Sequence, residues 1–204
     1  MAYADAPFGF IPVRHKNGSP WNGALELGWV DASDTTAIFP GDPVIVDGTA
    51  NTAEVEGVGQ GKNAPGMVKG YTRATAGTGN RVSGVCVAVV ASDRDSTTYR
   101  AASTERLIMV CTDPSAVYRV QADAAVAVAD VGRNTNILFD TAGSTSTGRS
   151  GAEVDATTAA GATNQCVIEG FWDDPENEPN AVGNQVLVSF GLHTQSVAGG
   201  IVGV

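Results

Sequence analysis

The side chains that could carry chemistry in this chain are few and widely separated. Only two histidines occur, His15 and His193, and a nucleophilic triad would need one of them beside a serine or cysteine and a carboxylate. Neither histidine is accompanied by a G-x-S-x-G motif or a comparable local signature. We therefore expect His193, which follows an apolar run, to be an ordinary, partly exposed residue, and we predict that the chain is not an enzyme.

The densest group of carboxylates lies between residues 173 and 178. Paired carboxylates can act as acid and base in glycoside hydrolysis, and they can bind Ca²⁺ through their oxygens. The spacing of an EF-hand is missing and prolines interrupt the segment, so its charge pattern favours a solvated acidic loop. Asp93 and Asp95 are interpreted in the same way, with Arg94 between them as a local partner. The acidic group consists of Asp173, Asp174, Glu176 and Glu178.

The glycine-rich stretch and the cysteines point to neither a cofactor nor a metal. Residues 57–66 contain Lys62, but Asn63 follows it where a phosphate-binding loop needs serine or threonine. The cysteines lack C-x-x-C spacing, and two lie inside apolar runs, which predicts reduced thiols packed as small hydrophobic residues. Their odd number is unlike a secreted disulfide framework, so we expect folding in a reducing cytoplasm. They are Cys86, Cys111 and Cys166.

The composition limits the partners of the chain. It has 204 residues with a formal net charge of -10, and 17% of them are charged. Direct nucleic-acid binding is not expected, because it needs clustered lysine and arginine, and Arg14, His15 and Lys16 form the only basic triplet. The first residues do not have the pattern of a signal peptide. No apolar run approaches the ~18 residues that a membrane-spanning helix needs.

Short runs rich in valine and isoleucine alternate with polar turns from residue 41 onward, and no helix-period stripe interrupts them. This pattern predicts a compact all-β fold, either a barrel or a sandwich, with long polar loops. Asp47-Gly48 predicts a hairpin turn, and the alternation over residues 117–122 predicts a half-exposed strand. Residues 124–129 fit a helix or a strand, and residues 140–164 fit a loop or a long hairpin. Strands are expected at 44–46, 82–90, 107–111, 117–122, 136–139, 165–172 and 185–192.

Residues 1–40 differ from the rest of the chain. Prolines and scattered aromatic residues make regular pairing difficult, so we expect an extended N-terminal arm. Such an arm either lies across its own domain or reaches a neighbouring subunit. Residues 41–196 are expected to form the β domain, with two β subdomains as a possibility, and residues 197–204 a flexible or docked tail.

Several stretches resemble a group of tailed-bacteriophage virion proteins of about this length, known as decoration or cement proteins. The resemblance spans most of the chain and includes no catalytic signature. It implies a protein of the outer capsid surface, made in the host cytoplasm, that bridges neighbouring major capsid proteins. The stretches are residues 6–15 (APFGFIPVRH), 20–23 (PWNG), 39–44 (FPGDPV), 73–77 (RATAG), 95–99 (DSTTY), 102–106 (ASTER) and 129–132 (ADVG) before Asn136.

With this resemblance, the arm is expected to contact the major capsid protein or a neighbouring subunit. A homo-oligomer is implied, with a trimer favoured over a dimer. One alternative is a carbohydrate- or receptor-binding β-sandwich module of a virion, with Trp172 and the acidic loop after it as the site. Another is a β-fold hydrolase that uses the acidic loop. The expected contact residues are Phe8, Phe10, Pro12, Arg14, Trp21 and Trp29.

Overall fold

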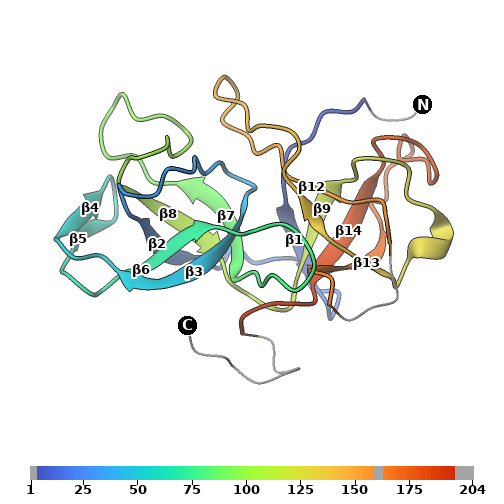
Figure 1. Ribbon diagram of the computed structural model, residues 1–204, viewed down its shortest axis with the longest axis horizontal. Coiled ribbons are helices and arrows are strands. Elements are labelled where there is room, and N and C mark those ends of the chain that lie inside the picture. The colour runs from blue at the N-terminus through green and yellow to red at the C-terminus, as the bar shows by residue number, and fades with distance from the viewer. Residues whose placement is uncertain (1–3, 159–162, 196–204) are drawn as a thin grey trace.

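Two β units lie side by side in the computed structural model, which describes residues 4–158 and 163–195 (Figure 1). The first is a closed barrel of five strands in the order β2-β6-β3-β7-β8. All neighbouring strands in the barrel are antiparallel except β2 and β6, which are parallel. The barrel strands are β2 (Glu26–Val30), β3 (Pro43–Ala50), β6 (Lys69–Arg73), β7 (Gly84–Val89) and β8 (Arg106–Cys111).

The second unit is an antiparallel five-stranded sheet in the order β1-β9-β14-β13-β10. Two small hairpins complete the strands, β4–β5 on the barrel and β11–β12 on the sheet unit. The only helical element of the described residues is the 3-10 turn η1 (Val128–Asp130). The sheet and hairpin strands are β1 (Ile11–His15), β9 (Ala116–Gln121), β10 (Asn134–Thr135), β13 (Cys166–Phe171), β14 (Gln185–Phe190), β4 (Val55–Gly57), β5 (Gly61–Asn63), β11 (Ile137–Leu138) and β12 (Glu153–Val154).

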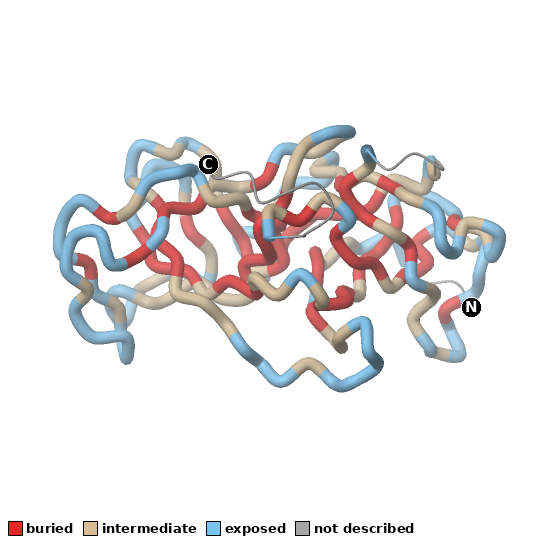
Figure 2. Tube along the Cα trace, turned by 90° about the horizontal axis from the view of Figure 1, so that it is seen from below, coloured by how far each residue is buried: buried red, intermediate tan, exposed pale blue. Residues whose placement is uncertain are grey.

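The predicted all-β class is confirmed, as a closed barrel beside an open sheet. Buried segments run through both units without a break, and the exposed segments are the loops around them (Figure 2). The largest core cluster belongs to the sheet unit, yet it includes Val82, Val85 and Cys111 from the barrel side. A second cluster fills the barrel, and a third lies under the β4–β5 hairpin. Because the largest cluster joins them, the two units pack as one body.

All seven predicted strands are present, with boundaries shifted by a few residues. The undecided segment 124–129 leads into the 3-10 turn. The strand predicted at 117–122 exists, but its predicted half-exposure is wrong. β9 lies between β1 and β14 and is buried along both faces except at Arg119. Residues 4–6 cover one side, where Gln121 Nε2 donates to the carbonyl of Ala4 and its Oε1 accepts from the amide of Ala6.

Two turn predictions are corrected. Asp47-Gly48 is not a hairpin turn, because β3 continues through it with a bulge between Val46 and Ala50. There, Asp47 Oδ1 accepts from the amide and hydroxyl of Thr49. Residues 57–66 are not all loop, since the tight hairpin of β4 and β5 includes much of the stretch. The long hairpin considered for residues 140–164 begins with the pairing of β11 and β12.

Of the two positions expected for the N-terminal arm, the described residues 4–40 take the first: they lie across their own domain, and they are paired in sheets where irregular structure was expected. Residues 4–40 lie on their own chain and supply β1 to the sheet and β2 to the barrel. Pro12 is tolerated within β1 because this strand is the edge of its sheet, where a missing N–H breaks no interior pairing. The barrel strands therefore begin at Glu26, ahead of the predicted boundary at residue 41. The predicted tail, residues 197–204, lies outside the described residues.

Candidate functional site

An arginine held between two aromatic rings marks the most distinctive surface of the molecule. The guanidinium carbon of Arg119 lies 4.7 Å from the ring centroid of Trp172 and 5.3 Å from that of Phe8. Its Nε donates a hydrogen bond of 2.5 Å to Oε1 of Gln185. Each contact limits the rotamers of a long side chain, so Arg119 presents its charge in a fixed place.

The strand pairing explains why these residues meet. Arg119 is the half-exposed residue of β9, and it faces Ile11 on β1 and Leu187 on β14. Trp172 follows the last residue of β13, and its amide donates to the carbonyl of Gln185. Phe8 stands three residues before β1 and directly before Gly9, whose φ is positive. Three distant parts of the chain thus converge on one side of β9.

Gly9 is required for this arrangement. Its φ of +79° is in the left-handed region that favours glycine. A Cβ at this position would lie 2.6 Å from Cβ of Ser150 and 2.7 Å from the carbonyl oxygen of Gly41. The amide of Phe10 then donates to that same carbonyl at 2.9 Å. This close approach joins the chain before β1 to the loop before β3.

An apolar groove of about 200 Å³ lies beside Phe8, at the junction of the two units. The stretch from Phe8 to Pro12 forms one wall, and barrel residues form another. Arg149, from the loop between β11 and β12, supplies the only charged side chain of the lining. Ile11 is 43% exposed, so the groove has an open apolar rim. The full lining is Phe8, Phe10, Ile11, Pro12, Pro40, Gly41, Val87 and Arg149.

We call the surface formed by Phe8, Ile11, Arg119, Arg149 and Trp172, together with the groove, the junction face. Aromatic residues and arginine are enriched at protein interfaces and dominate their binding energy. An apolar pocket beside two arginines can take a side chain and its neighbouring polar group. The junction face is therefore equipped for binding another molecule.

The structure separates the predicted contact residues into three groups. Phe8 and Pro12 line the groove of the junction face. Phe10 and Trp29 are only 1% and 3% exposed, so their assignment as contact residues is corrected: both are core residues. Phe10 packs against Tyr118 and Phe190, and Trp29 belongs to the cluster under the β4–β5 hairpin.

The remaining two lie beside the junction of the units. Trp21 is partly buried against the largest core cluster. Arg14 is half-buried at the bulge of β1, where it forms an isolated bridge with Pro20. Neither lines the groove.

Sequence reasoning missed Arg119, Arg149, Ile11 and Val87 as parts of this face. Arg119 did carry a signal, since it is the one charged residue between Val117 and Gln121 in an otherwise apolar or neutral strand. Arg149 carried none, because it lies in a low-complexity segment whose fold the sequence leaves open. Trp172 was considered on its own, and only strand pairing places it beside Phe8.

The two histidines are placed apart from this face. Nδ1 of His15 lies 2.9 Å from a carboxylate oxygen of Asp113, and Ser115 Oγ lies 3.5 Å from the same nitrogen. The three residue types of a hydrolytic triad therefore meet, but Ser115 donates its proton to Asp113 at 2.7 Å. Because Nδ1 faces both side chains, the serine is not set up as a nucleophile with the histidine as its base.

His193 is buried, with 1% of its surface exposed. Its Nδ1 accepts from the amide of Gln195, and its Nε2 has no hydrogen-bond partner among residues 4–158 and 163–195. Burial lowers the pKa of its imidazole from 6.5 to about 4. The predicted partial exposure of His193 is therefore wrong, because the bridge between Val82 and His193 places this residue inside the fold.

A buried carboxyl group stands out among the acidic residues. Glu153 on β12 is 4% exposed, and its Oε1 has no hydrogen-bond partner in the part of the chain that the structure describes. Burial is the main cause that raises its pKa from 4.5 to about 7, and the charges of Asp5, Asp123 and Asp140 add to it. The opposing hydrogen bond from Thr141 is long, at 3.4 Å.

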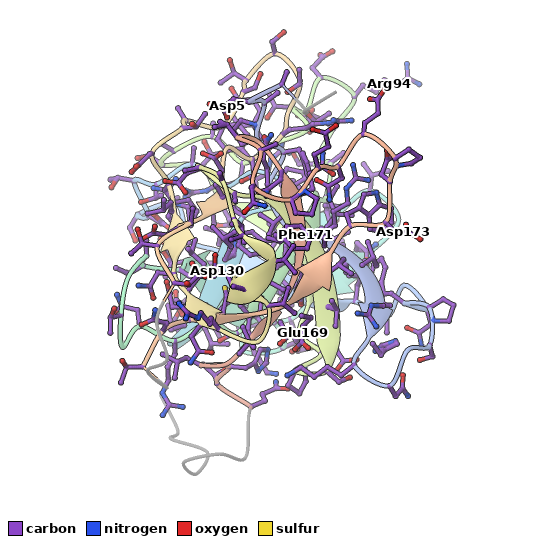
Figure 3. The ribbon with its side chains drawn as sticks, turned by 90° about the vertical axis from the view of Figure 1, so that its right-hand side faces the viewer. Asp5, Arg94, Asp130, Glu169, Phe171 and Asp173 are labelled. Carbon is purple, nitrogen blue, oxygen red and sulfur yellow. The ribbon has the colours of Figure 1, made fainter. Side chains whose placement is uncertain are left out.

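Hydrogen bonds within the acidic loop after Trp172 hold its turns in place. Asp174 Oδ1 accepts from the amide of Glu176, and Asn177 donates to the carbonyls of Trp172 and Gln185. Asp173 lies at the periphery of the molecule, on the side that faces the viewer in Figure 3. These contacts hold the loop beside Trp172.

Four further observations extend beyond single residues. Within residues 4–158 and 163–195, no three histidine, cysteine or acidic side chains are grouped so that they could hold one metal ion. The three cysteines are free and buried, as predicted, and burial raises the pKa of each thiol. No helix among the described residues is long and apolar enough to cross a membrane. Comparison with models of known protein families, with curated proteins and with solved structures found no match.

Proposed function

We propose that this chain is a structural protein of a tailed-phage virion that binds the outer surface of the capsid and bridges neighbouring major capsid proteins. The resemblance of seven stretches spread along the chain supports the phage assignment. The observation that carries a binding role is the junction face, where Arg119 is fixed between Phe8 and Trp172 beside an apolar groove.

Capsid stabilisation follows from mass action in this proposal. A protein that binds only the expanded shell stabilises it by RT ln(1 + [L]/Kd), about 2.7 kcal/mol for each site at a hundredfold excess over Kd. Many such sites across the seams of a shell resist the pressure of packaged DNA together. A homo-oligomer, with a trimer favoured, would add multivalency, because its second contact becomes intramolecular.

Co-sedimentation with expanded shells of the cognate major capsid protein tests this proposal. We expect saturable binding by the wild type, and about 30-fold weaker binding after Trp172→Ala or Phe8→Ala, equivalent to about 2 kcal/mol for a residue at the centre of an interface. Met67→Ala is the matched control, since Met67 is 71% exposed and lies outside the junction face. Thermal unfolding of each variant checks that the fold is intact.

Point substitutions are the appropriate test because a deletion of residues 1–30 would remove β1 and β2 from the two sheets. Loss of binding after that deletion would report an unfolded chain. Failure of the folded wild type to bind expanded shells would contradict the proposed function.

Carbohydrate or receptor binding is the second candidate, and the position of Trp172 beside an exposed polar loop favours it. The indole already stacks on Arg119, so part of its surface is not free for a sugar ring. A glycan array separates the two functions. Binding there that is lost in Trp172→Ala, without any shell binding, would replace the capsid assignment by this one.

A further inference from the structure

Two arginines of the junction face have no acidic partner. Arg119 donates to the neutral Gln185, and no ion pair joins it to any described residue. The guanidinium of Arg149 is exposed and makes neither an ion pair nor a hydrogen bond with the described residues. The chain has 22 acidic residues for 12 basic ones, so these cations stay unpaired despite an excess of carboxylates.

The groove that joins these arginines is small and apolar. Its volume of about 200 Å³ is below the ~300–1,000 Å³ of sites that enclose a whole small-molecule ligand. Its size suits an aliphatic or small aromatic side chain. Phe8 belongs to the groove lining and to the Arg119 contact, so a side chain in the groove would place its neighbours next to a fixed positive charge.

The neighbouring edge of the sheet limits how a partner can bind. Pro12 has no N–H to donate, the carbonyl of Val13 accepts from the amide of Trp21, and the amide of His15 donates to the carbonyl of Ser19. A strand added to β1 would find most of these groups unable to pair. Recognition at this edge therefore depends on side chains and not on main-chain pairing.

We infer that the groove binds an extended acidic–aliphatic segment of the capsid protein, with one apolar side chain in the groove and a nearby carboxylate on Arg119 or Arg149. This inference deepens the proposed function and rests on it for the identity of the partner. Charge complementarity carries the choice: a chain of net charge -10 keeps two unpaired guanidinium groups beside its apolar groove. Gln185 and the two rings already hold Arg119, so less side-chain freedom is lost when the segment binds.

Selection from a random displayed dodecapeptide library on the immobilised full-length chain tests the groove chemistry without the shell. We expect the selected peptides to share an apolar residue within a few positions of aspartate or glutamate. Their affinity should fall about tenfold in Arg149→Gln, and salt should weaken wild-type binding. Ile11→Glu, which adds a negative charge to the exposed rim, should weaken it by tenfold or more.

Matched controls lie away from the junction face. Arg94→Gln removes an exposed arginine of the loop after β7, which is labelled in Figure 3. Val58→Glu adds the same charge as Ile11→Glu at a valine that is 64% exposed in the β4–β5 turn, at the far end of the barrel (Figure 1). Both controls should bind the selected peptides like the wild type.

The inference is overturned if no peptides are selected, if they lack an acidic residue, or if Arg149→Gln and Ile11→Glu bind them as tightly as the controls do. A change of oligomeric state in Ile11→Glu would assign the groove to a second copy and would overturn it too. Shell binding separates it from the proposed function. If the wild type and Ile11→Glu sediment equally with shells, the groove does not contact the capsid protein, although the proposed function stands. If the peptides bind as expected but the wild type does not bind shells, the partner is not the capsid protein.

Discussion

Replacing the buried carboxyl of Glu153 with an amide should stabilise the protein at alkaline pH. Glu153 is 4% exposed and its Oε1 has no hydrogen-bond donor, while Asp5, Asp123 and Asp140 place negative charge around it. These surroundings raise its pKa from 4.5 to about 7. Because the folded pKa lies above the unfolded one, folding favours the protonated form. The contribution of this carboxyl group to the free energy of unfolding is complete below pH 4.5 and is lost as the pH rises to about 7.

The magnitude follows from the two pKa values. A difference between 4.5 and about 7, at about 1.4 kcal/mol for each pH unit, corresponds to about 3 kcal/mol of unfolding free energy. Glu153→Gln has no charge to bury, so at pH 8 it should exceed the wild type by up to about 3 kcal/mol. At pH 4 the two proteins should differ little, since the wild-type carboxyl is then protonated in both states.

Urea unfolding of both proteins at pH 4, 6 and 8 measures this difference. Glu105→Gln is the matched control, because Glu105 is exposed and its substitution should leave the pH dependence unchanged. A Glu153→Gln protein that is less stable than the wild type at pH 8 would refute the reasoning. So would a difference that stays constant over the pH range, since a constant effect reports packing and not ionisation.

Three further substitutions test other parts of the fold. Burial lowers the pKa of His193 from 6.5 to about 4, so wild-type stability should fall as the pH drops through this range, and His193→Gln should remove that loss in acid denaturation curves. Arg100 is fully buried, and its guanidinium donates to four backbone carbonyls, those of Asp31, Asp34, Thr36 and Thr104. Arg100→Met should lower the free energy of unfolding by about 3–5 kcal/mol in urea titrations. A decrease below about 1 kcal/mol would show that these carbonyls find other donors. Gly9→Ala should lower the melting temperature strongly and weaken ligand binding at the groove, because its Cβ would lie 2.7 Å from the carbonyl oxygen of Gly41; an unchanged melting temperature would contradict this close approach.

The strands of the apolar runs were predictable because their composition satisfies the pleated, buried surface that β structure needs. The segments of weak pattern were not. β6 (Lys69–Arg73) lies in a stretch with few apolar residues, and it forms because the barrel has to close between β2 and β3. Likewise, Asp47-Gly48 favours a hairpin turn locally, but pairing of β3 with β6 on both sides of the bulge continues the strand.

The aromatic residues of the first forty positions show why exposure could not be inferred from the sequence. Phe8 and Phe10 are two residues apart and similar in type, and both line the groove, yet only Phe10 belongs to the buried core. The difference depends on the positive φ of Gly9 and on the pairing of β1 with β9. This pairing joins residues more than a hundred positions apart. Long-range register of this kind leaves no local signal.

The junction face was predictable in its residue types and not in its assembly. Phe8 and Trp172 belonged to two separate hypotheses, a capsid-binding arm and a sugar-binding loop. The structure brings both to the guanidinium of Arg119, so the two hypotheses concern one surface.

Quantitative mass spectrometry of purified virions, before and after mild protease treatment of the intact particles, tests the central claim most directly. The proposed function predicts that this chain is present in a fixed ratio to the major capsid protein. It also predicts cleavage within intact particles, since the chain would lie on the outer surface. Virions that lack the chain, or that carry it in a protease-resistant position inside the shell, would contradict the assignment as a capsid-binding protein of the outer surface.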